Sequence, residues 1–197
     1  LSYIPDSKDL VLRRDGGCML ANGDIFCWGN NQYKKAGIES YGQLDTSLKP
    51  DYVNTPVMLK VQIDNIEVNN ETLDLITKKW YNNPYRVKFE KMAMNNKFIC
   101  GISPIFDYYE AGIRYKLGGD LYCNGYIHSD YFQTDNTGQI ETSILRKNKI
   151  VATGKENRIY NSSAIYLKDI VMVDGTWILL SDTGTLYSVG SNEKGAL

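Results

Sequence analysis

One short stretch, GCMLANGDIFCWGNN (residues 17–31), constrains the fold of this chain more than any other. Asn-Gly between β-forming residues, as at residues 22–23, is the strongest short-range signal for a two-residue hairpin turn with positive φ at both positions. Pairing outward from this turn places Cys18 opposite Cys27 at a non-hydrogen-bonded position, where Cα atoms approach to about 4.5 Å. A disulfide spans that distance, so the hairpin predicts a Cys18–Cys27 bridge. The alternative is a pair of unlinked, buried thiols.

The hairpin belongs to a unit that occurs three times in the chain. Each copy reads as a leading strand, a hairpin strand, a turn and a second hairpin strand, with cores near residues 8–31, 89–125 and 167–197. In the second copy, Cys100 and Cys123 occupy the matching strand ends, and a long insertion that includes IFDYYEAGIRY interrupts the hairpin. We therefore expect one repeat domain over residues 1–197.

Four cysteines allow three disulfide connectivities. The alignment of the copies selects Cys18 with Cys27 and Cys100 with Cys123. The third copy has Trp177 and Ser188 at the cysteine positions, so it is expected to lack the bridge.

These segments resemble the repeats of the regulator of chromosome condensation family, which read roughly C-A-L-x-x-D-G-x-V-x-C-W-G-x-N-x-x-G-Q-L-G. The matching pieces are CMLANGDIFCWGNN, YGQL and LLSDTGTLYSVGSNEKGAL, which begin at Cys18, Tyr41 and Leu179. The resemblance implies an all-β fold, a partial β-propeller of about three blades of antiparallel strands with long inserted loops. Because family propellers commonly have seven blades, we expect this chain to be a fragment of a larger one.

The cysteines also bear on the cellular location. The cysteine-bearing form of the repeat is similar to that of secreted and surface repeat proteins of bacteria. Disulfides persist in oxidising compartments, so we expect an extracellular, cell-surface or periplasmic protein. No uninterrupted apolar run approaches the ~18 residues that a membrane-spanning helix needs.

The charge balance argues against a nucleic-acid partner. The chain has 22 basic and 23 acidic residues, with a formal net charge of −1. A protein that binds the phosphate backbone needs a basic stripe, whereas the lysines and arginines here are dispersed among acids.

The residues that could support catalysis are few. The only histidine, His128, would have to serve any nucleophile–histidine arrangement, and its neighbours indicate a loop or strand end. Both cysteine pairs are assigned to bridges, so no metal site and no cofactor are expected. Asp107 and Glu110 are three residues apart in a tyrosine-rich loop, where carboxylates are usually solvated. We therefore predict that the chain is not an enzyme. The alternative is a hydrolase or lyase, which would need acids or histidines clustered at a propeller face.

Aromatic residues in the inserted segments are the best candidates for binding. Tyrosine and tryptophan are enriched at recognition sites, and loops on a rigid scaffold usually carry function. The expected partner is another protein, with a glycan as the alternative; association with missing blades or another chain is also expected. Two readings compete with this one: the rings could pack against the blades, or the chain could be purely architectural. The candidate binding residues are Trp80, Tyr81, Tyr85, Tyr108, Tyr109 and Tyr115.

Two long connections separate the copies. In the first, residues 54–68 (NTPVMLKVQIDNIEV) alternate like outer blade strands, and residues 69–86 fit either a short helix or a strand pair. In the second, we expect a polar loop and two short strands, KNKIVATG (residues 147–154) and SSAIYLK (residues 162–168).

Overall fold

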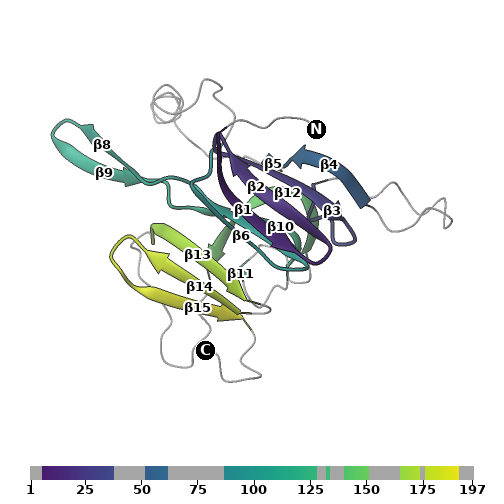
Figure 1. The fold of residues 1–197 in the computed structure, drawn as a ribbon. Helices are drawn as coiled ribbons and strands as arrows, with labels where there is room; N and C mark the ends of the chain where they lie inside the picture. The colour runs from purple at the N-terminus through teal and green to yellow at the C-terminus, as the bar shows by residue number, and fades with distance from the viewer. Residues whose placement is uncertain are drawn as a thin grey trace.

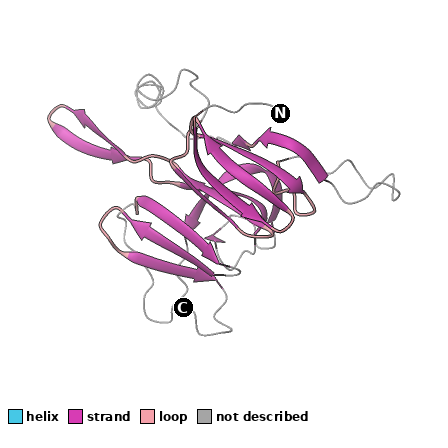
Figure 2. Ribbon diagram, viewed as in Figure 1, coloured by secondary structure: helices cyan, strands magenta, loops and turns pink. Residues whose placement is uncertain are grey.

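The chain folds into strands, turns and loops. The computed structural model describes residues 6–37, 52–61, 87–127, 132–133, 140–150, 165–173 and 176–190. Within these ranges there is no helix (Figure 2), so none is long and apolar enough to cross a membrane. The strands form three principal sheets, and a two-stranded hairpin extends away from them (Figure 1). The all-β prediction is confirmed.

The first sheet contains the predicted hairpin. β2 and β3 pair with Cys18 opposite Cys27, in the predicted register. Asn22 and Gly23 form the turn with φ values of 51° and 76°. Both values lie in the left-handed region, which asparagine and glycine adopt more readily than other residues. The strand order is β1-β2-β3-β4, with β1 (Ser7–Arg13), β2 (Gly16–Ala21), β3 (Asp24–Asn30) and β4 (Tyr52–Met58).

The second sheet is built on the interrupted hairpin of the second copy. β7 and β10 pair with Cys100 opposite Cys123, although an insertion separates them in the sequence. A segment of the first connection, β5, joins this sheet by pairing in parallel with β12. The order is β11-β12-β10-β7-β6, with β5 (Lys60–Val61), β6 (Lys91–Met94), β7 (Phe98–Ile102), β10 (Leu121–Ile127), β11 (Phe132–Gln133) and β12 (Ile140–Ile150).

Both cysteine pairs lie at disulfide-bonding distance, in the pairing that the repeat alignment selects. The Cα–Cα distance is 4.1 Å in each pair. All four cysteines are buried, so the bridges lie in the core and fix the register of two hairpins.

The third sheet corrects one prediction. It consists of β13 (Leu167–Val173), β14 (Thr176–Ser181) and β15 (Leu186–Gly190). We predicted Trp177 and Ser188 at the cysteine positions, but the residue opposite Ser188 is Ile178, and Trp177 pairs one step away with Val189. Because side chains alternate along a strand, this one-residue offset places Trp177 on the other face of the sheet.

The sheets stack in series, each through a defined face. We call the face that carries the cysteine bridge the disulfide face, and the other the opposite face. The disulfide face of the first sheet, with Cys18 and Cys27, packs against Met94 and Ile99 on the opposite face of the second. Cys18 Sγ lies 3.3 Å from Met94 Sδ.

The second junction repeats this arrangement. Cys100, Cys123 and Phe98 lie on the disulfide face of the second sheet and pack against Met172 and Trp177 of the third. The rings of Phe98 and Trp177 have centroids 4.5 Å apart. Two apolar cores of the same design therefore join three sheets, as expected for neighbouring propeller blades.

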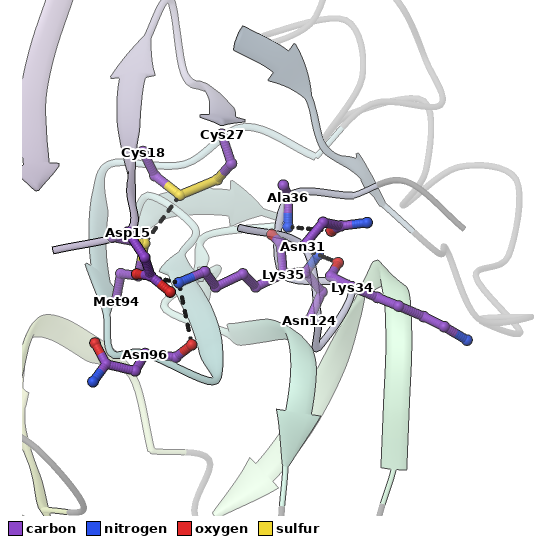
Figure 3. The surroundings of a disulfide bond; sticks show 10 residues. All are labelled: Asp15, Cys18, Cys27, Asn31, Lys34, Lys35, Ala36, Met94, Asn96 and Asn124. Carbon is purple, nitrogen blue, oxygen red and sulfur yellow. Dashed lines mark hydrogen bonds and ion pairs between the residues drawn. A yellow bond between two sulfur atoms is a disulfide. The ribbon is translucent and has the colours of Figure 1, made fainter. Parts of the chain in front are cut away.

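The segment after β3 forms a polar contact between the first two sheets (Figure 3). Lys35 is only 2% exposed. Its Nζ lies 3.3 Å from Asp15 Oδ1 and donates to the Asn96 carbonyl oxygen at 3.1 Å. Asn31 supports this loop because its side-chain oxygen accepts a hydrogen bond from the Ala36 amide at 2.9 Å. The Asn-Asn pair that follows the first hairpin thus shapes a loop that holds two sheets together.

Arg13 connects all three sheets. From the end of β1, its guanidinium donates to the carbonyl oxygen of Met94 at 3.0 and 3.2 Å and to that of Met172 at 3.2 Å. Arg13 therefore bonds to backbone carbonyls near the ends of two later leading strands.

The predictions for the connections are partly correct. β4 overlaps residues 54–68 and β5 lies within them, as expected of outer strands. The helix or strand pair predicted at residues 69–86 cannot be compared at residues 69–86, which lie outside the described ranges. In the second connection, β12 begins at Ile140 rather than residue 147, because it pairs along most of β10. The strand predicted at residues 162–168 is correct at residues 167–168, which begin β13, and wrong at residues 165–166, which are not in a strand; residues 162–164 lie outside the described ranges.

Candidate binding site

The insertion of the second copy forms a separate hairpin. β8 (Phe106–Glu110) and β9 (Ile113–Leu117) pair only with each other among the described strands. Ala111 and Gly112 make the turn with φ values of 49° and 80°, as a two-residue turn that matches the strand twist requires. Figure 1 shows the hairpin extending away from the three sheets.

The tip of the hairpin exposes large apolar side chains. Tyr109 is 65% exposed and Ile113 is 57% exposed. Tyr109 pairs with Arg114 and Ile113 pairs with Glu110, so the two side chains project from opposite faces of the hairpin. Each gains free energy when a partner that surrounds the turn covers it. We call these two residues the hairpin tip.

The base of the hairpin is anchored. Lys116 forms an ion pair with Asp182 in the turn of the third sheet, and its Nζ lies 5.4 Å from the centroid of the Tyr166 ring. Gly118 and Gly119 follow with φ values of 82° and 66° and return the chain to β10. The Gly119 carbonyl oxygen accepts a hydrogen bond from the Leu167 amide at 2.9 Å, so the base is tied to the third sheet.

An ion pair crosses the hairpin between its tip and its base. Arg114 Nη2 donates to Asp107 Oδ2 at 2.7 Å. This hydrogen bond is the main reason why the pKa of Asp107 falls below the ordinary value of 3.8. Because the pKa is lowered, the ion pair contributes fully above pH 3.8 and is lost only as the pH falls through the lowered value. The pair therefore persists at neutral pH.

The structure places the predicted binding residues in different ways. Tyr109 is at the exposed tip, and Tyr108 and Tyr115 are cross-strand backbone partners in the same hairpin. Trp80, Tyr81 and Tyr85 lie outside the described residues, as does His128.

Sequence reasoning missed Ile113 and Lys116, which complete the tip and the anchor. An Ala-Gly turn with Ile113 directly after it could have identified the tip, whereas the partner of Lys116 is 66 residues away. No local pattern indicates a contact of that kind.

The described residues include no cluster of potential metal ligands. No three histidine, cysteine, aspartate or glutamate side chains among them lie together as metal ligands would. Two carboxylates near the hairpin are instead paired with bases, Asp107 with Arg114 and Asp182 with Lys116.

Comparison with known proteins gives matches at the level of structure. No protein-family model matches the chain, and no curated protein has a matching sequence. The structure of human WBSCR16 matches with a TM-score of 0.54 and 13% identity, over 98% of this chain and 36% of that one. Prp20p from Saccharomyces cerevisiae matches with a TM-score of 0.55 and 14% identity, over 95% of this chain and 34% of that one.

A third match is yeast RCC1 (Prp20) bound to Kap60, with a TM-score of 0.54 and 12% identity. This chain has an RCC1-like fold. The likeness confirms the predicted all-β, partial-propeller architecture, and we call the three sheets blades from here on. The chain spans about a third of the length of these neighbours, since it covers 36%, 34% and 32% of them.

Proposed function

We propose that this chain is a non-enzymatic binding module of an exported RCC1-like propeller, and that it recognises a protein through the tip of the β8–β9 hairpin. The observation that carries the proposal is the hairpin itself: it is anchored at its base, extends from the blades, and exposes Tyr109 and Ile113 at its turn. A rigid support reduces the entropy lost on binding, and exposed aromatic and aliphatic side chains supply the contact.

The structural neighbours support the protein-binding part. Prp20p is described with its binding properties to Gsp1p and histones, and yeast RCC1 is described in complex with Kap60. Both descriptions concern Prp20, so one protein of this fold is described with protein partners. The balanced charge of this chain, −1 overall, favours a partner bound through apolar contact over nucleic acid.

Export is supported by the cysteines. Both pairs are buried and at bonding distance in cores between blades, where a disulfide would be structural. Structural disulfides are typical of oxidising compartments and rare in the cytosol and nucleus.

The exposure of the tip also favours recognition over a purely architectural role. A ring that served only to cover the blades would be buried against them, whereas Tyr109 is 65% exposed. The alternative of a hydrolase or lyase that uses a bound metal has no group of three or more histidine, cysteine, aspartate or glutamate side chains to support it within the described ranges.

The test is retention of exported proteins from the source organism on the immobilised, oxidised chain. We expect a protein that binds the wild type to be lost on a variant with Tyr109→Ser and Ile113→Ser. A matched control carries Tyr52→Ser and Met58→Ser, which remove an exposed ring and an exposed apolar side chain from the outer strand β4. Equal retention by all three chains would contradict the proposal, and binding to a glycan array that depends on the tip would assign the site to glycans instead.

A further inference from the structure

Two turns that lie far apart in the sequence meet at one end of the blades. They are the β1–β2 turn at residues 14–15 and the β6–β7 turn at residues 95–97. Lys35 joins them, because its Nζ lies 3.3 Å from Asp15 Oδ1 in the first turn and donates to the Asn96 carbonyl oxygen in the second (Figure 3). The charged side chains of the two turns therefore act on the same part of the surface.

The side chains that flank this contact are basic. Arg13 and Arg14 directly precede Asp15, and Lys97 ends the second turn. All three basic residues are exposed, and none has an ion-pair partner among the described residues. Asp15 does not offset their charge, because it is already paired with Lys35. We call Arg13, Arg14 and Lys97 the basic end.

The other end of the blades is different, because its bases are paired with acids. The leading strands begin there, and the β2–β3 and β14–β15 turns lie there. The ion pairs at that end are Lys8 with Glu90, Lys88 with Asp24, Lys91 with Asp169 and Lys116 with Asp182. Although the formal net charge of the chain is −1, positive charge without a carboxylate partner thus gathers at the basic end.

The rings beside the basic end indicate which anionic groups it fits. Lys97 Nζ lies 5.5 Å from the centroid of the Tyr126 ring, and the centroid of the Tyr33 ring lies 5.7 Å from that of Tyr126. Both rings are half-buried. Unpaired bases bind by stacking on open aromatic faces, which this crowded pair does not offer. Arginine binds a carboxylate through two parallel hydrogen bonds and needs no ring, so the basic end fits carboxylates better than nucleic acid.

We propose that the basic end binds an acidic segment of a partner protein. Carboxylates of neighbouring aspartates or glutamates in that segment pair with Arg14 and Lys97, and the charge of Arg13 adds to the attraction. Complementary charge of this kind also speeds association. The surface lies at the opposite end of the blades from the β8–β9 hairpin, which follows the far end of β7. The inference therefore does not depend on the hairpin or its partner.

The test uses a fluorescein-labelled decaglutamate peptide as the probe. Fluorescence anisotropy with the full, oxidised chain at about 0.05 M salt, where surface charges are weakly screened, measures its binding. We expect the wild type to bind the peptide. One exposed ion pair contributes up to about fivefold in affinity, so we expect Arg14→Gln with Lys97→Gln to weaken binding by about tenfold or more.

A matched control removes the same amount of charge elsewhere. Lys60→Gln with Lys168→Gln changes two other exposed lysines and should leave the affinity at the wild-type level. All four substituted side chains are exposed, so neither double variant disturbs the core. The proposal is overturned if the wild type does not bind the peptide, or if the two double variants bind it equally well.

Two other anions test the chemical class of the partner. They are an oligothymidylate and an oligogalacturonate, each with the same number of negative charges as the peptide. Weaker binding of both supports an acidic protein segment. Tighter binding of either one than of the peptide, with a loss in the variant that lacks Arg14 and Lys97, would assign the surface to nucleic acid or to an acidic glycan and overturn the proposal.

Discussion

Single side chains hold this fold together at places that sequence patterns do not reveal. Lys35 is the clearest case, since its ammonium is buried between Asp15 of the first blade and the Asn96 carbonyl of the second. Lysine is usually exposed, so no sequence rule assigns it to a core. Its contact with Asn96 also spans 61 residues. By contrast, the cysteine pairs could be predicted, because direct cross-strand opposition follows from a short turn and a repeat.

Replacement of this lysine tests its role. Lys35→Met keeps most of the apolar stem but removes the charge, leaving the Asp15 carboxylate and the Asn96 carbonyl without their donor. We expect the free energy of unfolding to fall by about 2 kcal/mol, the range for a lost hydrogen bond to a charged group. Urea unfolding followed by circular dichroism measures the change. Lys60→Met, at an exposed lysine, should stay within about 0.5 kcal/mol of the wild type. Equal stability of the two variants would contradict the bridging role.

Some strands could be predicted from local sequence signals, whereas the extent of others depends on pairing with distant strands. The Asn-Gly turn predicted the register of β2 and β3 residue by residue. In the third blade the longer turn shifted the alignment by one position, and this was enough to assign Trp177 to the wrong face. β12 and β5 depend on pairing with each other and with β10, so their extent could not be predicted from their own composition.

The base of the β8–β9 hairpin provides a test at this level. Gly112 and Gly118 both have positive φ, at 80° and 82°, so an alanine is strained at either position. A Cβ at Gly112 would meet nothing within 4 Å, whereas one at Gly118 would lie 1.8 Å from the Pro104 carbonyl oxygen. We expect the free energy of unfolding to fall by about 1 kcal/mol in Gly112→Ala and by about 3 kcal/mol or more in Gly118→Ala, as measured by urea unfolding. Similar costs for both variants would show that the hairpin base is not closely packed.

At the scale of the whole molecule, the repeat allowed the architecture to be predicted. It did not allow the binding surface to be predicted. Three copies of one motif implied three blades, and the structure has three stacked sheets with an RCC1-like arrangement. The composition of the insertion in the second copy indicated an aromatic segment. Only the fold shows that this segment projects as the anchored β8–β9 hairpin.

The register of the repeats, the oxidised state and the exported location all depend on the same two cysteine pairs. Peptide mapping of the native, non-reduced protein by mass spectrometry tests them together. We predict disulfide-linked peptides joining Cys18 to Cys27 and Cys100 to Cys123, with no free thiol. Four free thiols, or crossed pairs such as Cys18 with Cys100, would contradict both the blade register and the proposal of an exported binding module.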